Sequence, residues 1–136
     1  VTNKGTGRRL RHSGGRYLKD IVTGYPYGFT NEIAGKTGTT QNQSDGWFIG
    51  MVPNLITGIW SGCQDRAAHF GSTYYGQGAT VALPIWGLYM RSLYEMPELG
   101  ISKEPFERPQ NMSINVDCDA VDVQAGGNFN DDDEFN

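Results

Sequence analysis

Two apolar β-rich runs lie only two residues apart in the middle of the chain, and this spacing restricts how the chain can fold. The runs are residues 46–52, GWFIGMV, and residues 55–62, LITGIWSG. Pro53 and Asn54 between them suit a tight hairpin, which makes the two strands antiparallel neighbours. A third β-rich run, residues 31–40, precedes them. Three strands with short connections predict an antiparallel sheet.

The hydrophobic period changes over residues 80–94, which are predicted to form a helix. Apolar side chains recur there every three or four residues and share one helix face: Leu83, Trp86, Met90, Leu93 and Tyr94. Thr80 is the predicted N-cap, and Pro84 is close enough to that end to cost only one backbone hydrogen bond. The aromatic stripe indicates a face packed on the sheet rather than a cofactor-binding surface. The predicted class is α+β, an antiparallel sheet of about three strands with a packed C-terminal helix.

Charge is distributed unevenly along the chain. Residues 1–19 contain six basic and no acidic side chains, whereas residues 117–136 contain seven acidic and no basic ones. The basic arm has one aromatic residue, Tyr17, and no regular helix pattern, so we predict a solvated loop, with a short helix over residues 17–23, rather than a nucleic-acid-binding arm. The acidic, Gly- and Asn-rich end is predicted to be disordered.

The size of the chain bounds its organisation. With 136 residues it has room for one domain or part of one, and its apolar stretches are shorter than the roughly 18 residues that cross a membrane. Three strands and one helix make a thin core for an independent domain. Because the sequence also begins with Val1 rather than Met, we expect it to be a piece of a longer polypeptide whose missing layers lie upstream.

Several familiar motifs fail on their spacing. Gly35-Lys36-Thr37 ends like a phosphate-binding P-loop, but Thr30 stands where that motif needs glycine. Two GxG fragments also lack the third small residue of a dinucleotide fingerprint. Cys63 and Cys118 form no CxxC pair and leave the redox compartment and their own disulfide state open, and Cys63 with His69 lacks metal-ligand spacing. No cofactor or metal is predicted.

The motif that remains is Lys36-Thr37-Gly38-Thr39, a KTG sequence on a predicted strand. A substrate that ends in a carboxylate needs a cation to attract it and hydroxyl groups to orient it, which Lys36, Thr37 and Thr39 supply. Gly38 has no side chain, so an extended substrate can approach the strand edge and add to it as a further strand. At such an edge the backbone N–H of Thr39 can serve as half of an oxyanion hole.

The surroundings of this motif extend it well beyond three residues. The series GTGRR, AGKTGTTQNQSDGWFIGMVP, LITGIWSG and LPIWGLYM resembles, in this order, the C-terminal part of the transpeptidase domain of class A penicillin-binding proteins. The resemblance covers residues 1–110 and leaves residues 111–136 as an acidic tail. It implies part of the penicillin-binding transpeptidase fold, which serine β-lactamases share.

The resemblance also implies residue roles. Lys36 would belong to the active-site hydrogen-bond network, Thr37 and Thr39 would bind the substrate carboxylate, and the Thr39 N–H would stabilise the oxyanion. Trp47 would support the wall of the site, and we interpret its ring as packed in the core. Gly5-Thr6-Gly7 matches a loop that precedes the KTG strand, with a role in backbone geometry.

Two further signatures of the family are missing. No Ser or Thr in this chain is followed three residues later by Lys, so the SxxK nucleophile and its base are absent. The one SxN match, Ser113-Ile114-Asn115, follows KTG instead of preceding it, and we attribute it to chance. The chain alone is therefore predicted to be inactive, with both signatures upstream.

The implied parent is a peptidoglycan synthase that cross-links stem peptides by serine acyl transfer from D-Ala-D-Ala. Its implied partners are stem peptides, β-lactams and the upstream remainder of the same polypeptide. A glycosyltransferase domain, a membrane anchor outside this segment and a periplasmic location follow from the resemblance only. The alternatives are a non-catalytic module of the same fold that binds peptidoglycan or a partner protein, and a β-lactamase, whose KTG lacks this extended context.

Overall fold

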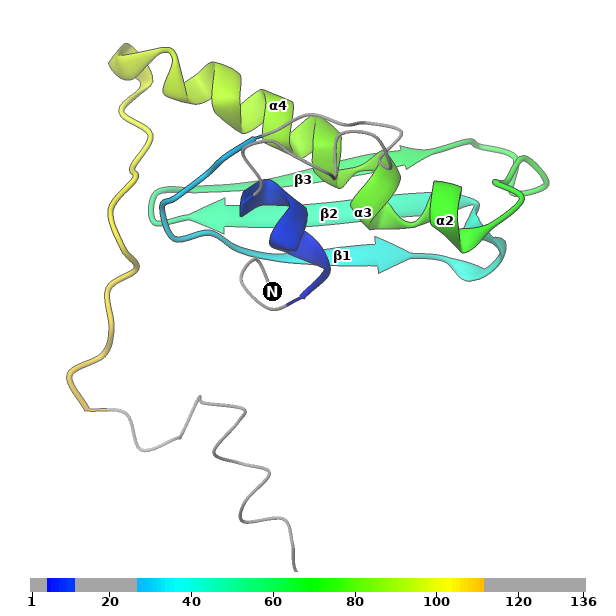
Figure 1. The fold of residues 1–136 in the computed structure, drawn as a ribbon, viewed down its shortest axis with the longest axis horizontal. Coiled ribbons are helices and arrows are strands. Elements are labelled where there is room, and N and C mark those ends of the chain that lie inside the picture. The colour runs from blue at the N-terminus through cyan, green and yellow to red at the C-terminus, as the bar shows by residue number, and fades with distance from the viewer. Residues whose placement is uncertain (1–4, 12–26, 112–136) are drawn as a thin grey trace, which may run out of the picture. The chain divides into compact units, whose positions relative to one another are not determined.

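The computed structural model describes residues 5–11 and 27–111, and the chain divides into two units, Val1–Phe106 and Glu107–Asn136. The described helices and strands belong to the first unit (Figure 1). The short helix expected over residues 17–23 lies outside the described residues, as does the acidic tail from residue 112 onward.

The three predicted strands form one antiparallel sheet in the order β1-β2-β3, which confirms the expected topology (Figure 1). They are β1 (Ala34–Thr39), β2 (Asp45–Val52) and β3 (Leu55–Gly62). β1 is shorter than the predicted run, whereas β3 has the predicted bounds and β2 begins one residue earlier. The α+β class is therefore confirmed.

The β2–β3 connection is the predicted two-residue hairpin, in which Val52 pairs with Leu55. Pro53 fixes a negative φ, so this turn is not one of the positive-φ turns that usually join two strands so closely. The side chain of Asn54 anchors it instead. Asn54 Nδ2 donates to the carbonyl of Gly100 at 2.8 Å, and Asn54 Oδ1 accepts from the N–H of Ser102 at 2.9 Å.

The helix predicted over residues 80–94 is divided between α3 (Gly78–Val81) and α4 (Leu83–Tyr94), with a break at Ala82. A further short helix, α2 (Thr73–Gly76), precedes them. Pro84 accounts for the break, because it has no N–H to donate to the carbonyl of Thr80. The prediction of Thr80 as an N-cap is wrong: it lies inside α3, and its hydroxyl donates to the carbonyl of Tyr74 at 3.2 Å.

Part of the basic arm is ordered, where the sequence predicted a solvated loop. Residues Thr6–Arg11 form a 3₁₀ helix, η1. Arg9 Nη1 donates to the carbonyl of Ala79 at 3.0 Å, and Arg11 Nη1 donates to the carbonyl of Phe29 at 2.9 Å. Both guanidinium groups therefore fasten η1 to distant backbone carbonyls rather than remaining free in solvent.

The core lies between one face of the sheet and the helices α3 and α4. Trp86 of α4 is fully buried and lies edge-on to Phe48, with 5.3 Å between the two ring centres. Its Nε1 donates to Thr57 Oγ1 at 2.7 Å. A Cβ on Gly50 would lie 2.4 Å from the indole, so only glycine leaves room for this ring. The apolar face predicted for α4 thus packs on the sheet, with Leu83 and Met90 also buried.

The opposite face of the sheet is apolar and exposed. Side chains alternate along a strand, so Trp47 and Ile49 lie on the side opposite Phe48, with Trp60 and Ile56 of β3 on the same face. These four side chains are 43% (Trp47), 46% (Ile49), 46% (Trp60) and 67% (Ile56) exposed. The prediction that Trp47 packs in the core is therefore wrong for this unit. Near-continuous apolar strands such as β2 are typical of sheets covered on both faces.

Among the described residues, none of the helices has the length and apolar character needed to cross a membrane.

Gly50→Ala should destabilise the fold, because the new methyl group must displace the buried indole of Trp86. Overpacking of this kind costs about 1 to 3 kcal/mol. Gly58→Ala is the matched control in β3, since its Cβ would meet only Ile49 Cγ1 at 3.6 Å, an ordinary contact. Urea unfolding followed by circular dichroism should show a lower midpoint for Gly50→Ala alone; equal midpoints would contradict this packing.

The exposed apolar face should cause the 136-residue chain to self-associate. Sedimentation equilibrium is expected to give an apparent mass that rises with concentration, and the double variant Ile49→Thr/Ile56→Thr should reduce the rise while keeping β-branched residues in both strands. Ile85→Thr, an exposed position on α4, serves as the control. A wild-type chain that stays monomeric at all concentrations is the contrary result.

Candidate substrate-binding edge of β1

The KTG motif lies in β1, which is an edge strand of the sheet (Figure 1). The N–H of Thr40 donates to the carbonyl of Asp45 at 3.1 Å, so residue 40 directs its backbone groups toward β2. These groups alternate in direction along a strand. The N–H and C=O groups of Thr39, Thr37 and Gly35 therefore point away from β2, at the free edge.

The side chains of the motif lie on both faces of the sheet. Lys36 pairs with Ile49 and shares the exposed apolar face, whereas Thr37 and Thr39 extend from the face that carries α3. Lys36 Nζ donates to the carbonyl of Thr37 at 2.7 Å. Because that carbonyl points outward, the ammonium group lies against the free edge. The cation and the hydroxyl groups predicted to act together thus meet at the edge from opposite faces.

A neighbouring segment fixes the hydroxyl of Thr37. Thr6 Oγ1 in η1 lies 2.8 Å from Thr37 Oγ1, a hydrogen bond between residues 31 positions apart. Sequence analysis assigned the GTG loop only a role in backbone geometry. The structure brings the Thr6 side chain into direct contact with the motif, which no local pattern in the sequence could indicate.

The hydroxyl of Thr39 is bound by the start of α3. The N–H of Gly78 donates to Thr39 Oγ1 at 3.0 Å. A Cβ on Gly78 would lie 2.3 Å from the carbonyl oxygen of Gly38 and 2.4 Å from that of Trp47, so glycine is required for this close approach. α3 therefore supports the end of the KTG strand directly.

Gly38 and Trp47 are cross-strand partners on the exposed face. A Cβ on Gly38 would lie 3.2 Å from Trp47 Cβ, tighter than an ordinary contact. The indole thus stands beside the part of β1 that has no side chain. This position suits a wall beside the edge rather than a core side chain.

Asp45 anchors the loop between β1 and β2, a role that sequence reasoning did not assign. Its carboxylate accepts from Trp60 Nε1 at 3.1 Å, Thr40 Oγ1 at 3.2 Å and Arg66 Nη2 at 3.4 Å. Desolvation works to raise the pKa of this carboxyl, but the hydrogen bonds from Arg66, Thr40 and Trp60, with the charge of Arg66, lower the pKa below its ordinary 3.8. The charged form is therefore favoured in the fold.

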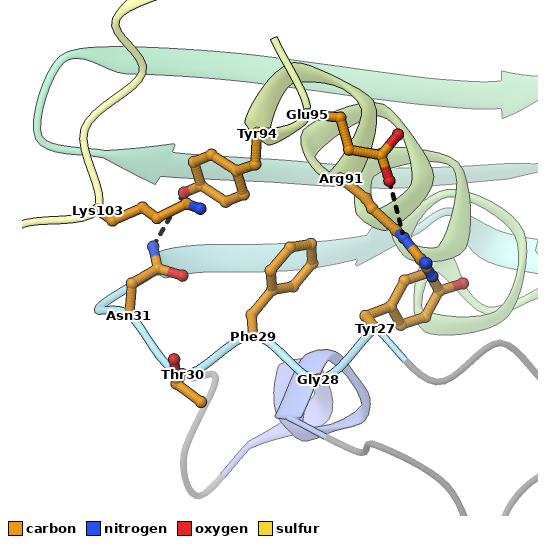
Figure 2. Close-up of a pocket in the computed structure, with 9 residues that line it drawn as sticks. All are labelled: Tyr27, Gly28, Phe29, Thr30, Asn31, Arg91, Tyr94, Glu95 and Lys103. Carbon is orange, nitrogen blue, oxygen red and sulfur yellow. Dashed lines mark hydrogen bonds and ion pairs between the residues drawn. The ribbon is translucent and has the colours of Figure 1, made fainter. Parts of the chain in front are cut away.

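A separate pocket of about 660 Å³ lies between the segment before β1 and the end of α4 (Figure 2). Asn31 Nδ2 donates to the Tyr94 hydroxyl at 2.9 Å, and Lys103 Nζ stands 4.6 Å from the centre of the Tyr94 ring. Burial raises the pKa of Tyr94, although the bond from Asn31 lowers it, so the hydroxyl stays protonated at neutral pH. The KTG residues do not line this pocket.

Cys63 is an exposed free thiol that lines a smaller cavity together with His69. Within residues 5–11 and 27–111, no three His, Cys, Asp or Glu side chains are grouped as metal ligands would be. Cys118 lies outside the described residues.

The geometry of this edge suits an extended ligand. A lysine, two threonine hydroxyl groups and outward backbone N–H groups line one strand edge, a donor set suited to an anionic chain in β conformation. An α+β fold with a KTG edge strand and a C-terminal helix is the arrangement that the resemblance to penicillin-binding transpeptidases implies.

Comparison with known proteins identifies the family. The chain is 32% identical over 109 residues to penicillin-binding protein 1A of Escherichia coli (strain K12), covering 71% of this chain and 12% of that protein. It is 40% identical over 85 residues to penicillin-binding protein 1A of Aquifex aeolicus (strain VF5), covering 62% and 11%. The match to the Neisseria flavescens protein of the same name is 35% over 85 residues, covering 62% and 10%. No family model matches.

The chain thus belongs to the penicillin-binding protein 1A family and corresponds to a segment of these proteins. It spans only about a tenth of the length of the relatives named above, 10 to 12%.

Acid should remove a stabilising contribution of Asp45. Its pKa is lower in the fold than in the unfolded chain, so this contribution is full above the ordinary value of 3.8 and is lost as pH falls through the folded value. The difference in unfolding free energy between wild type and Asp45→Asn should therefore shrink between pH 6 and about pH 3 in urea titrations.

Arg66→Gln is the companion variant for this experiment. It should keep part of the pH dependence, because Thr40 and Trp60 still donate to the carboxylate. A difference between wild type and Asp45→Asn that is constant over this pH range would show that the network does not lower the Asp45 pKa.

Proposed function

We propose that this chain is the C-terminal part of the transpeptidase region of a peptidoglycan synthase and supplies the strand that binds the donor stem peptide. The observation that carries the proposal is the placement of Lys-Thr-Gly-Thr on a free sheet edge with the Thr37 and Thr39 amides directed outward. A peptide ending in D-Ala-D-Ala, or a β-lactam that mimics it, adds along this edge as a further strand.

Each residue of the edge has a part in this binding. Lys36 contributes the positive charge that attracts the terminal carboxylate, and the hydroxyl groups of Thr37 and Thr39 orient it. Gly38 leaves space for the backbone of the substrate, and Trp47 forms the wall on the exposed face. The N–H of Thr39 stabilises the oxyanion that develops on the scissile carbonyl.

The reaction needs groups that the chain does not contain. A serine of an SxxK motif, elsewhere in the longer polypeptide, attacks the penultimate D-Ala carbonyl and passes its proton to the lysine of that motif. The terminal D-Ala leaves, and an amine of a second stem peptide takes the acyl group from the serine. The 136-residue chain by itself is inactive under this proposal.

The longer polypeptide also completes the fold. Its helices cover the apolar face of Trp47, Ile49, Ile56 and Trp60, which are exposed here. A glycosyltransferase domain, a membrane anchor and a position on the periplasmic side of a bacterial inner membrane belong to the same proposal. Support for them comes from the similarity to penicillin-binding protein 1A.

Lys36→Ala in the longer product of the same reading frame should slow acylation by a β-lactam about 10- to 100-fold, the value of one charge-assisted hydrogen bond. Intact-mass measurements on samples quenched at successive times give the rate of adduct formation. Lys103→Ala is the control, because Lys103 lies over the ring of Tyr94 and lines a pocket that the KTG residues do not line. An unchanged rate for Lys36→Ala removes this residue from the site.

The same mass measurement separates enzyme from binding module. An adduct on the longer product and none on the 136-residue chain supports the transpeptidase with its nucleophile outside this segment. An adduct on the short chain would place the nucleophile here and overturn the assignment. Absence of an adduct from both would favour a module that binds peptidoglycan or a partner protein without catalysis.

A further inference from the structure

The two threonine hydroxyl groups of the edge are held in different ways, and the difference concerns their protons. A hydroxyl group can donate one hydrogen bond and accept two. The N–H of Gly78 can only donate, so Thr39 Oγ1 accepts in their 3.0 Å bond. That bond leaves the Thr39 proton available to a ligand. Thr39 is therefore set as a donor by the start of α3.

The hydroxyl of Thr37 has no such fixed partner. Its neighbour at 2.8 Å is Thr6 Oγ1, and either oxygen of this pair can be the donor. If Thr6 donates, the proton of Thr37 is free for a ligand, as it is at Thr39. If Thr37 donates, its proton is already used and it offers the ligand lone pairs, which repel an anion.

Thr6 stands on an anchored element. The η1 helix is joined to α3 by Arg9 Nη1, which donates to the carbonyl of Ala79 at 3.0 Å and to Thr80 Oγ1 at 3.1 Å. Its residues Gly7 and Leu10 are buried. The same helix α3 thus supports Thr39 directly and Thr37 through η1. The positions of both hydroxyl groups therefore depend on α3.

We propose that Thr6 is a positioning residue, whose hydroxyl donates to Thr37 Oγ1 and thereby directs the Thr37 proton toward the carboxylate of the bound ligand. An anion at the edge favours this direction, because a chain of hydrogen bonds ending on a negative charge is mutually polarised. Thr37 and Thr39 then present two donors and no competing acceptor. The inference rests on the proposed function of the edge.

The test uses the longer product and two ligands, a penicillin and its methyl ester, in which the carboxylate is masked. Thr6→Val should weaken the apparent binding of the acid about 3- to 10-fold, the value of one neutral hydrogen bond. The maximal acylation rate and the reaction with the ester should not change. Thr6→Ser keeps the hydroxyl and should restore binding, and Thr30→Val is a control at an exposed threonine outside the edge.

A double-mutant cycle completes the test. Once Thr37→Val has removed the acceptor, adding Thr6→Val should cause no further loss of binding affinity for the acid. Equal losses with acid and ester, or additive losses in the cycle, would mean that Thr6 acts only on the fold and would overturn the inference. If Thr37→Val weakens binding of the acid and Thr6→Val leaves that binding unchanged, the inference is also overturned, while the proposed function stays intact. A wild-type product that takes up neither ligand would overturn the proposed function itself.

Discussion

The packing of the Trp86 indole against Gly50 is the contact on which the rest of this fold depends. The indole is fully buried, lies edge-on to Phe48 and donates to Thr57, so one side chain of α4 engages both β2 and β3. That contact decides which face of β2 is covered. Because β1 pairs with β2 in register, it also decides that Thr37 and Thr39 lie beside α3 and that Lys36 lies on the other side.

Glycine at a few positions lets helices reach the strand backbone. Gly78 approaches the carbonyl groups of Gly38 and Trp47 so closely that any Cβ would collide with them, and its N–H then reaches Thr39. The abundance of glycine, 19 of 136 residues, thus has a structural reason in the contact between helix and strand as well as in turns. The same closeness explains how a helix of only four residues can support the end of the KTG strand.

Local periodicity was enough to predict the three strands, the hairpin and the apolar face of α4, because alternation and helical spacing are properties of neighbouring residues. It failed at one local helix break and at contacts between distant residues. Thr80 resembled an N-cap, but Pro84 ends the preceding helix and leaves Thr80 inside it. Trp47 resembled a core residue, but it is 43% exposed on the face of the sheet opposite Phe48. Thr6 contacts Thr37 across 31 positions, and no local spacing encodes such a contact.

The edge of β1 is where the two faces of the sheet meet, and under the proposed function this accounts for the order of residues in the motif. Adjacent residues on a strand point to opposite faces, so a lysine followed by a threonine cannot both serve a ligand above one face. They can serve a ligand that lies in line with the sheet. Lys36 already turns back to the Thr37 carbonyl at the edge. The exposed apolar face therefore bears on binding as well as stability: a layer over Trp47 and Ile49 would also confine the Lys36 ammonium to the edge, where the threonine hydroxyl groups are held.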